Sequence, residues 1–126
     1  MRVIVSIILS LAIFIGFALW VQHSMKKSSD ILTQHFQSLE EAVKEEEWDK
    51  ANMQLESIMK AWNSTKTKWQ MLIDHQEVDN IDSTLARVIQ YVKLKVKEDS
   101  LAEIAALKLY VTHIPSTESL KLENVF

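Results

Sequence analysis

Residues 48–73 read WDKANMQLESIMKAWNSTKTKWQMLI, and this stretch decides the fold class. Its apolar side chains recur at steps of three, four or seven residues, at Trp48, Ala51, Leu55, Ile58, Trp62, Trp69 and Ile73. Such spacing places them on one stripe of an α-helix, with polar residues on the opposite face. The stretch therefore predicts an amphipathic helix over 48–73 that buries its stripe against other helices.

The segments on both sides show the same periodicity. Before it, the apolar stripe consists of Leu32, Phe36, Leu39 and Val43. This predicts a helix over 29–46, and nothing between residues 21 and 32 separates it from the N-terminal segment. After it, a third helix carries Ile81, Leu85, Val88 and Val92, and a fourth carries Leu101, Ile104, Ala105, Leu107, Lys108 and Val111.

Polar residues between these stripes predict where the helices begin and end. Asp79 or Asn80 is expected to cap the third helix, with Asp82 completing a capping box if Asp79 is the cap. Asp99 or Ser100 is expected to cap the fourth helix. That helix should end at or before residue 114, because the residue preceding a proline is disfavoured in the α conformation. Residues 91–97 also alternate with period two, so a short strand competes there, but a lone strand is unstable and we favour the helix.

Short charged turns, Glu45–Glu47 and Lys97–Asp99, join the helices into two antiparallel hairpins. The expected architecture is all-α, with a four-helix bundle over 28–115 and a short TPR-like α-solenoid as the alternative. The chain has only one glycine and one proline, which disfavours hairpin sheets and phosphate-binding loops. It has no cysteine, which removes disulfides and thiolate metal sites. No cofactor is predicted.

The N-terminal segment 3–21 reads VIVSIILSLAIFIGFALWV, without a charge. As a helix it would be about 28 Å long, close to the hydrocarbon thickness of a bilayer. We therefore expect residues 1–27 to be a membrane anchor flanked by Arg2, Lys26 and Lys27. A cleaved signal peptide is the alternative, but bulky Trp20 occupies the region where the peptidase requires small residues. The domain is expected outside the cytoplasm, although the flanking charges nearly balance.

The remaining 11 residues, 116–126, form a polar tail. Four apolar residues, Leu120, Leu122, Val125 and Phe126, are expected to fold it back onto the bundle. The net charge of −3 is more negative beyond the anchor, where acidic residues dominate, so nucleic acid is not an expected partner.

Three groups of residues are candidates for binding. Asp74, His75, Glu77, Asp79 and Asp82 could hold a cation, although an acidic loop that caps the next helix explains them better. Trp48, Trp62 and Trp69 could contact a protein partner, although a role in the core is favoured. Arg87, Lys93, Lys95 and Lys97 form a basic cluster, either a solvated helix face or a contact for anionic headgroups. No catalytic constellation can be assembled, so we expect no enzyme activity.

Several motifs together resemble a known family. They are EWDKA at 47–51, Trp62, HQEVDNI at 75–81, the Ser83-x-Leu85-Ala86-Arg87 pattern, LAEIA at 101–105 and HIP at 113–115. In this combination the chain resembles domain-of-unknown-function family 4363, which consists of small membrane-anchored bacterial proteins. The resemblance implies a helical, single-span bacterial protein and implies no activity.

These observations lead to one expected function and one alternative. We expect a non-enzymatic, single-pass protein of the cell membrane that acts as an interaction or accessory subunit of a membrane complex. Its partners would be the bilayer, through residues 3–21, and a protein, plausibly another membrane protein. The alternative is an extracytoplasmic sensor or binder of a cation or small ligand at the loop between the hairpins.

Overall fold

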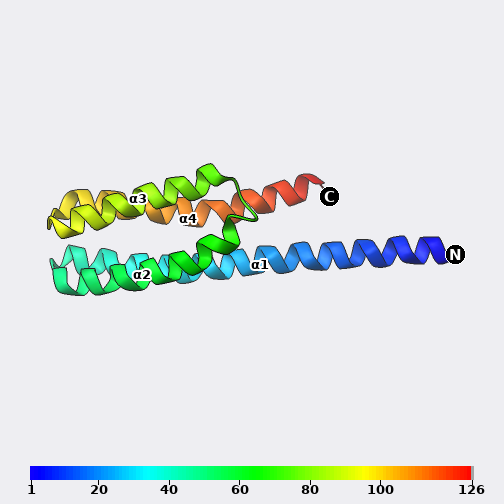
Figure 1. The fold of residues 1–126 in the computed structure, drawn as a ribbon, viewed down its shortest axis with the longest axis horizontal. Coiled ribbons are helices and arrows are strands. Elements are labelled where there is room, and N and C mark those ends of the chain that lie inside the picture. Colours follow the sequence, from blue (N-terminus) through cyan, green and yellow to red (C-terminus); the bar gives the residue numbers. More distant parts are fainter. Residues whose placement is uncertain (126) are drawn as a thin grey trace.

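Four helices make up the chain: α1 (Arg2–Lys44), α2 (Trp48–Trp69), α3 (His75–Lys93) and α4 (Lys97–Val125). The computed structural model describes the backbone of residues 1–125 and the side chains of residues 1–114. No strand occurs in this described backbone, so the all-α prediction is confirmed and the competing strand over 91–97 is wrong. Figure 1 shows the two antiparallel hairpins, α1 with α2 and α3 with α4, lying along each other.

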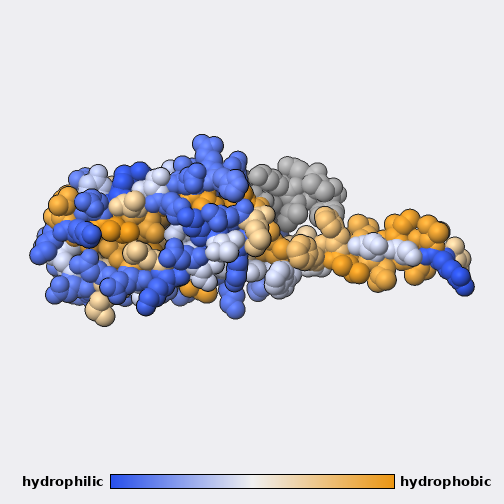
Figure 2. Space-filling view, viewed as in Figure 1, coloured by the Kyte–Doolittle hydropathy of each residue, from blue (hydrophilic) through white to orange (hydrophobic). Residues whose placement is uncertain are grey.

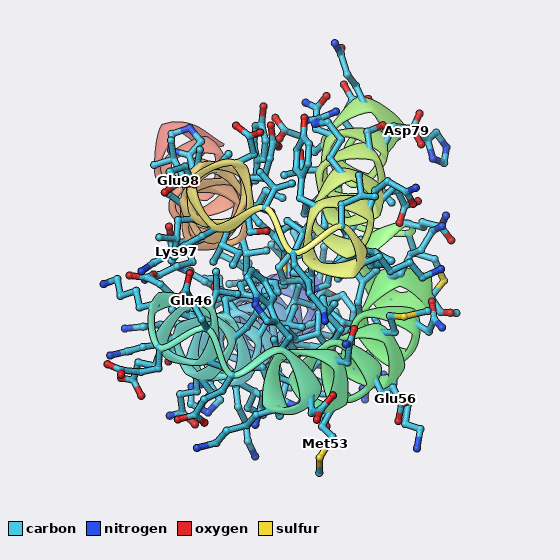
Figure 3. All side chains as sticks on the ribbon, turned by 90° about the vertical axis from the view of Figure 1, so that its left-hand side faces the viewer. Glu46, Met53, Glu56, Asp79, Lys97 and Glu98 are labelled. Carbon is cyan, nitrogen blue, oxygen red and sulfur yellow. The ribbon has the colours of Figure 1, made fainter. Side chains whose placement is uncertain are left out.

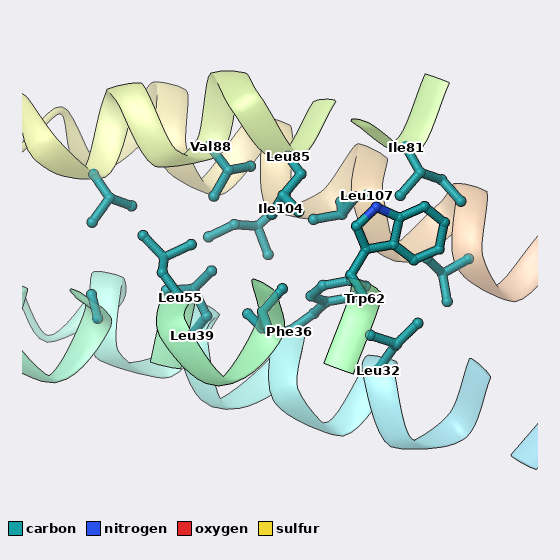
Figure 4. Packing of buried hydrophobic residues seen from close by; sticks show 14 of the residues in the cluster. Leu32, Phe36, Leu39, Leu55, Trp62, Ile81, Leu85, Val88, Ile104 and Leu107 are labelled. Atoms are coloured by element: carbon teal, nitrogen blue, oxygen red, sulfur yellow. The ribbon is translucent and has the colours of Figure 1, made fainter. Parts of the chain in front are cut away.

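The helices close into a bundle and do not stack as solenoid repeats. Helix α4 packs on both α1 and α3, α1 packs on α2, and sparser contacts between α2 and α3 complete the ring. The buried side chains of all four helices form one hydrophobic cluster. Figure 4 shows part of it, with Phe36 and Leu39 facing Leu85 and Ile104 across the bundle. The predicted apolar stripes supply most of this core.

The two hairpin turns have the same backbone geometry. In the first, Glu46 adopts a left-handed conformation (φ 54°), and the Glu47 N–H donates to the Ala42 carbonyl. In the second, Lys95 has φ 57°, and the Val96 N–H donates to the Tyr91 carbonyl. Both are Schellman motifs in which a charged residue occupies the position that usually carries glycine.

The predicted position of the second turn is wrong. Helix α3 ends at Lys93 and α4 already begins at Lys97, so Asp99 and Ser100 lie inside α4 and do not cap it. Ser100 is fully buried and its hydroxyl donates to the Val96 carbonyl. The Schellman turn at Lys95 explains the shift, because it ends α3 and starts α4 within three residues.

The connection between the hairpins also differs from the prediction. Helix α2 ends at Trp69, not at residue 73, and α3 begins at His75. Asp74 is the N-cap: its backbone is extended, and its carboxylate accepts from the Gln76 N–H at 3.0 Å. Asp79 and Asn80 therefore lie inside α3 and are not caps.

The predicted end of the fourth helix at residue 114 is wrong, because α4 continues through Pro115 to Val125. A proline inside a helix has no N–H for the carbonyl four residues earlier, which here belongs to Val111. The buried Ser29 hydroxyl of α1 donates to that carbonyl at 2.9 Å. A tertiary hydrogen bond thus replaces one that Pro115 cannot make. The predicted packing of the side chains of Leu120, Leu122, Val125 and Phe126 lies outside the described side chains.

Helix α1 is a single helix of 43 residues that serves two environments. Its N-terminal half projects from the bundle, and its most apolar window of 18 residues has no buried side chain. Figure 2 shows this projecting segment as mostly hydrophobic surface, next to the largely hydrophilic surface of the bundle. The C-terminal half buries Met25, Ser29, Leu32, Phe36, Leu39, Ala42 and Val43 in the core.

Candidate functional site

The residues predicted as a cation site lie on the first two turns of α3. His75 and Asp79 are exposed and Glu77 is half-buried. In the end-on view of Figure 3, Asp79 lies at the outer edge of the bundle. Within the described part of the chain, no group of three or more His, Asp or Glu residues is placed to hold a metal ion.

Asp82, the last of the five candidate ligands, is engaged by two side chains of α2. Its Oδ1 accepts a hydrogen bond from the Trp62 indole at 2.7 Å, and its Oδ2 lies 2.6 Å from the Lys66 ammonium. The carboxylate thus satisfies the indole N–H of a tryptophan that is otherwise surrounded by apolar side chains. Helices α2 and α3 make fewer contacts than the other neighbouring helices of the ring, and this polar group adds to the apolar packing between them.

The three tryptophans proposed as partner contacts occupy two kinds of environment. Trp62 and Trp69 are 2% and 1% exposed, and their rings meet edge to face with centroids 5.9 Å apart. Figure 4 places Trp62 between α2 and Ile81, beside Leu107 of α4. Their burial assigns both to the core, the role that the sequence favoured, while half-buried Trp48 remains accessible at the start of α2.

Trp48 borders an open hollow at the end of the bundle farthest from the N-terminus. The hollow measures about 450 Å³ and is lined by Glu46, Glu47, Trp48, Asp49, Lys50 and Lys95, residues of both hairpin turns. Figure 3 shows this end of the bundle, with Glu46 and Lys97 at the two turns. The hollow is mixed in charge and widely open, so it is better suited to a protein surface than to a small enclosed ligand.

The predicted basic cluster does not lie beside the projecting apolar half of α1. Lys93 and Lys95 are exposed at the turn between α3 and α4, which Figure 1 places at the opposite end of the bundle from the N-terminal half of α1. Arg87 donates to the Glu103 carboxylate at 3.0 Å and to the Thr84 hydroxyl at 3.1 Å. This arrangement fits the solvated helix face and argues against contact with headgroups.

Sequence reasoning missed an apolar crevice where the projecting part of α1 meets the bundle. Its volume is about 210 Å³, and its walls are Phe14, Phe17, Ala18, Val21, Gln22, Met25 and Leu72. Leu72 belongs to the connection between α2 and α3. The apolar run Met71-Leu72-Ile73 was the available signal, but it extended the stripe of the preceding helix and was assigned to it.

Helix α1 is also the one helix of the described residues that is long and apolar enough to cross a membrane. This criterion rests on length and composition. It indicates a membrane or signal-anchor location and leaves the side of the domain open.

Comparison with known proteins identifies a family. A family model described as "Domain of unknown function (DUF4363)" covers residues 19–125, which include the whole bundle. Neither the curated proteins nor the solved structures contain a significant match.

Proposed function

The chain belongs to the DUF4363 family, to which no activity is assigned, and we propose that it is a non-enzymatic, single-pass membrane protein. Its helical domain would act as an interaction or accessory subunit of a membrane complex. The partner would be a protein, most simply another membrane protein held in the same bilayer.

The continuity of α1 carries this proposal. The same helix presents an unburied apolar segment at one end and builds the bundle core at the other. Exposed apolar surface of this extent is unfavourable in water and favourable in a bilayer. Because no loop separates the two halves, the bundle would stand at a defined height above the membrane, as a docking module requires.

Candidate partner contacts are the exposed apolar side chains of the bundle. Met53 on α2, Leu94 in the second turn and Leu109 on α4 all have more than half of their surface exposed. Figure 3 shows Met53 pointing away from the bundle, close to Glu56. A photoactivatable amino acid at each apolar position of the full chain, expressed in its native host, would test the proposal. Asn63 and Asp99, exposed residues of α2 and α4, are matched control positions, because each is ten residues from Met53 or Leu109 and lies on a different face of the same helix.

We expect at least one apolar position to give a discrete adduct with a single membrane protein, and the controls to give none. Adducts only with lipid or with the chain itself, at every position, would refute the accessory-subunit proposal.

The domain is proposed to lie outside the cytoplasm, because the uncharged segment 3–21 resembles an export signal in which bulky Trp20 prevents cleavage. The chain lacks cysteine, so Met53→Cys introduces a single reactive thiol. A membrane-impermeant maleimide should label this variant in intact cells. Labelling only after lysis would place the domain in the cytoplasm, and release of the protein from membranes by alkaline washing would refute the anchor itself.

The alternative proposal, a sensor for a cation at the start of α3, has less support because Asp82 is occupied by Trp62 and Lys66. His75, Glu77 and Asp79 would have to bind without it. Calorimetry of the full chain with calcium, magnesium and zinc measures this directly. No heat and no change in melting temperature with any of the three ions would eliminate the alternative.

A further inference from the structure

We propose that the connection between α2 and α3, residues 70–74, is a second membrane contact. Its Met71 and Leu72 side chains would insert into the interfacial layer of the bilayer that α1 spans. The inference rests on the anchoring part of the proposed function and adds to it a site on the bundle itself.

The connection is an ordered turn that presents apolar side chains to the outside. The N–H groups of Leu72 and Ile73 both donate to the Trp69 carbonyl at 2.9 Å, and Met71 N–H donates to the Lys68 carbonyl at 3.3 Å. Buried Trp69 at one end and half-buried Ile73 at the other fix the turn to the core. Yet Met71 is 78% exposed and Leu72 is 40% exposed. Two large apolar side chains held outward by a hydrogen-bonded turn indicate a surface that is covered in the working protein.

The position of the turn identifies what covers it. Leu72 forms one wall of the apolar crevice, and its other walls lie on α1 from Phe14 to Met25, where the unburied segment meets the first buried residue of the core. The sequence of α1 changes from apolar to polar after Val21, where Gln22 and His23 follow. The turn therefore lies at the height where the proposed span leaves the hydrocarbon. Figure 1 shows it at the end of the bundle that faces the N-terminus, beside α1.

The charges nearby suit a lipid surface. Lys26 and Lys27 of α1 follow the crevice residue Met25, and Lys68 of α2 precedes the connection; all three are exposed, against one exposed carboxylate in the connection, that of Asp74. Lysine side chains at this depth can place their ammonium groups among phosphates while their stems stay apolar. Insertion of Met71 and Leu72, with an acyl chain in the adjoining crevice, would remove their apolar surface from water without any additional partner.

A second contact point has a mechanical consequence. A single span leaves the domain free to tilt relative to the bilayer, whereas a span and a turn together define the face of the bundle that lies against the membrane. The opposite end, with the hairpin turns and Trp48, is then held outward toward a partner.

Fluorescence quenching in vesicles tests the proposal on the full chain. Three single variants are labelled with an environment-sensitive NBD group: Met71→Cys, Leu94→Cys and Ile8→Cys. Each is reconstituted into vesicles of phosphatidylcholine and phosphatidylglycerol that contain lipids with a nitroxide on the acyl chain. Leu94 is the matched control, since it is 64% exposed, apolar and located in a turn at the other end of the bundle. All three positions are exposed, so the labels do not disturb the core.

We expect quenching of the label at residue 8 by deep nitroxides and quenching of at least about twofold at residue 71 by shallow nitroxides, with little effect at residue 94. Quenching at residue 8 with none at residue 71 would overturn the second contact and leave the anchor intact. Absence of quenching at residue 8 would overturn the anchor, and the second contact with it.

Discussion

The hydroxyl of Ser29 in α1 donates a hydrogen bond of 2.9 Å to the carbonyl of Val111 in α4, 82 residues away in sequence. Both residues are buried, and Val111 lies four residues before Pro115, which has no N–H to give it. The bond lies where α1 emerges from the bundle toward its apolar segment. The helix with the projecting apolar segment is therefore joined to the last helix of the bundle at a carbonyl that would otherwise lack a donor.

Replacing Ser29 with alanine should destabilise the bundle by about 1–3 kcal/mol, because a buried carbonyl then loses its donor. The free energy of unfolding can be measured from tryptophan fluorescence of the full chain in detergent micelles, since Trp62 and Trp69 report on the core. Ser38→Ala is the matched control, because the exposed Ser38 hydroxyl donates only to Gln34 of its own helix.

The double variant Ser29→Ala with Pro115→Ala gives a sharper result. Alanine at position 115 restores an N–H for the Val111 carbonyl, so the Ser29 substitution should cost less than about 1 kcal/mol in that background. Equal costs in both backgrounds would show that the Ser29 bond does not substitute for the missing N–H.

The connection between α2 and α3 should depend on the Asp82 carboxylate. Asp82→Ala leaves the Trp62 indole N–H without its acceptor and should lower the free energy of unfolding by about 1–3 kcal/mol. Asp82→Asn keeps an acceptor oxygen but loses the charge pair with Lys66, and should cost about 1 kcal/mol or less. Asp79→Asn, one turn earlier and exposed, should change stability by less than about 0.5 kcal/mol. The idea fails if the alanine and asparagine variants at Asp82 unfold alike.

Glycine in place of the left-handed residue of either hairpin turn should raise the stability of the bundle. Glu46→Gly and Lys95→Gly each remove a Cβ from a left-handed backbone conformation that is unfavourable for residues with a Cβ. The greater conformational entropy of glycine in the unfolded chain offsets part of this gain, so each variant should be more stable by about 0.5–1 kcal/mol. Glu45→Gly is the control: Glu45 has φ −84°, so the same change there should destabilise the bundle. Thermal melts of the three variants measure these changes in stability.

Acid should weaken the contact between α1 and α4. The Lys108 ammonium, 2.8 Å from the Glu40 carboxylate and assisted by Lys44, holds the pKa of Glu40 below its ordinary value. A lowered carboxyl pKa in the folded state adds stability above the unfolded pKa, and this stability is lost as the pH falls through the folded pKa.

At neutral pH, Glu40→Gln should therefore be less stable than the natural chain by about 0.5–1 kcal/mol, a typical value for a partly exposed ion pair. The difference should shrink as the pH falls below about 4.5 and be smaller in high salt. Urea unfolding at pH 7 and at pH 3 measures it, with Glu56→Gln on the outer face of α2 as the control. A difference that stays constant across this range would exclude the charge pair as its source.

Local pattern alone was enough to predict the helical class, the two hairpins and most of the core. The stripes that contain Phe36, Ile58, Val88 and Ile104 repeat every three or four residues, and only a helix gathers such residues on one face. No residue between Val21 and Leu32 breaks a helix, so the sequence allowed one continuous helix there, and α1 is continuous in the structure.

What the sequence could not supply depended on contacts between distant segments. From the sequence, Asp82 could be a cap or a ligand, whereas the fold places Trp62 and Lys66 beside its carboxylate. The predicted end of the fourth helix was wrong because a proline ends a helix unless another group replaces its missing N–H. Ser29 provides that replacement from the far end of the chain. Periodicity is a property of neighbours in sequence and can be seen in the chain, whereas the partner of a buried polar group is chosen by tertiary packing.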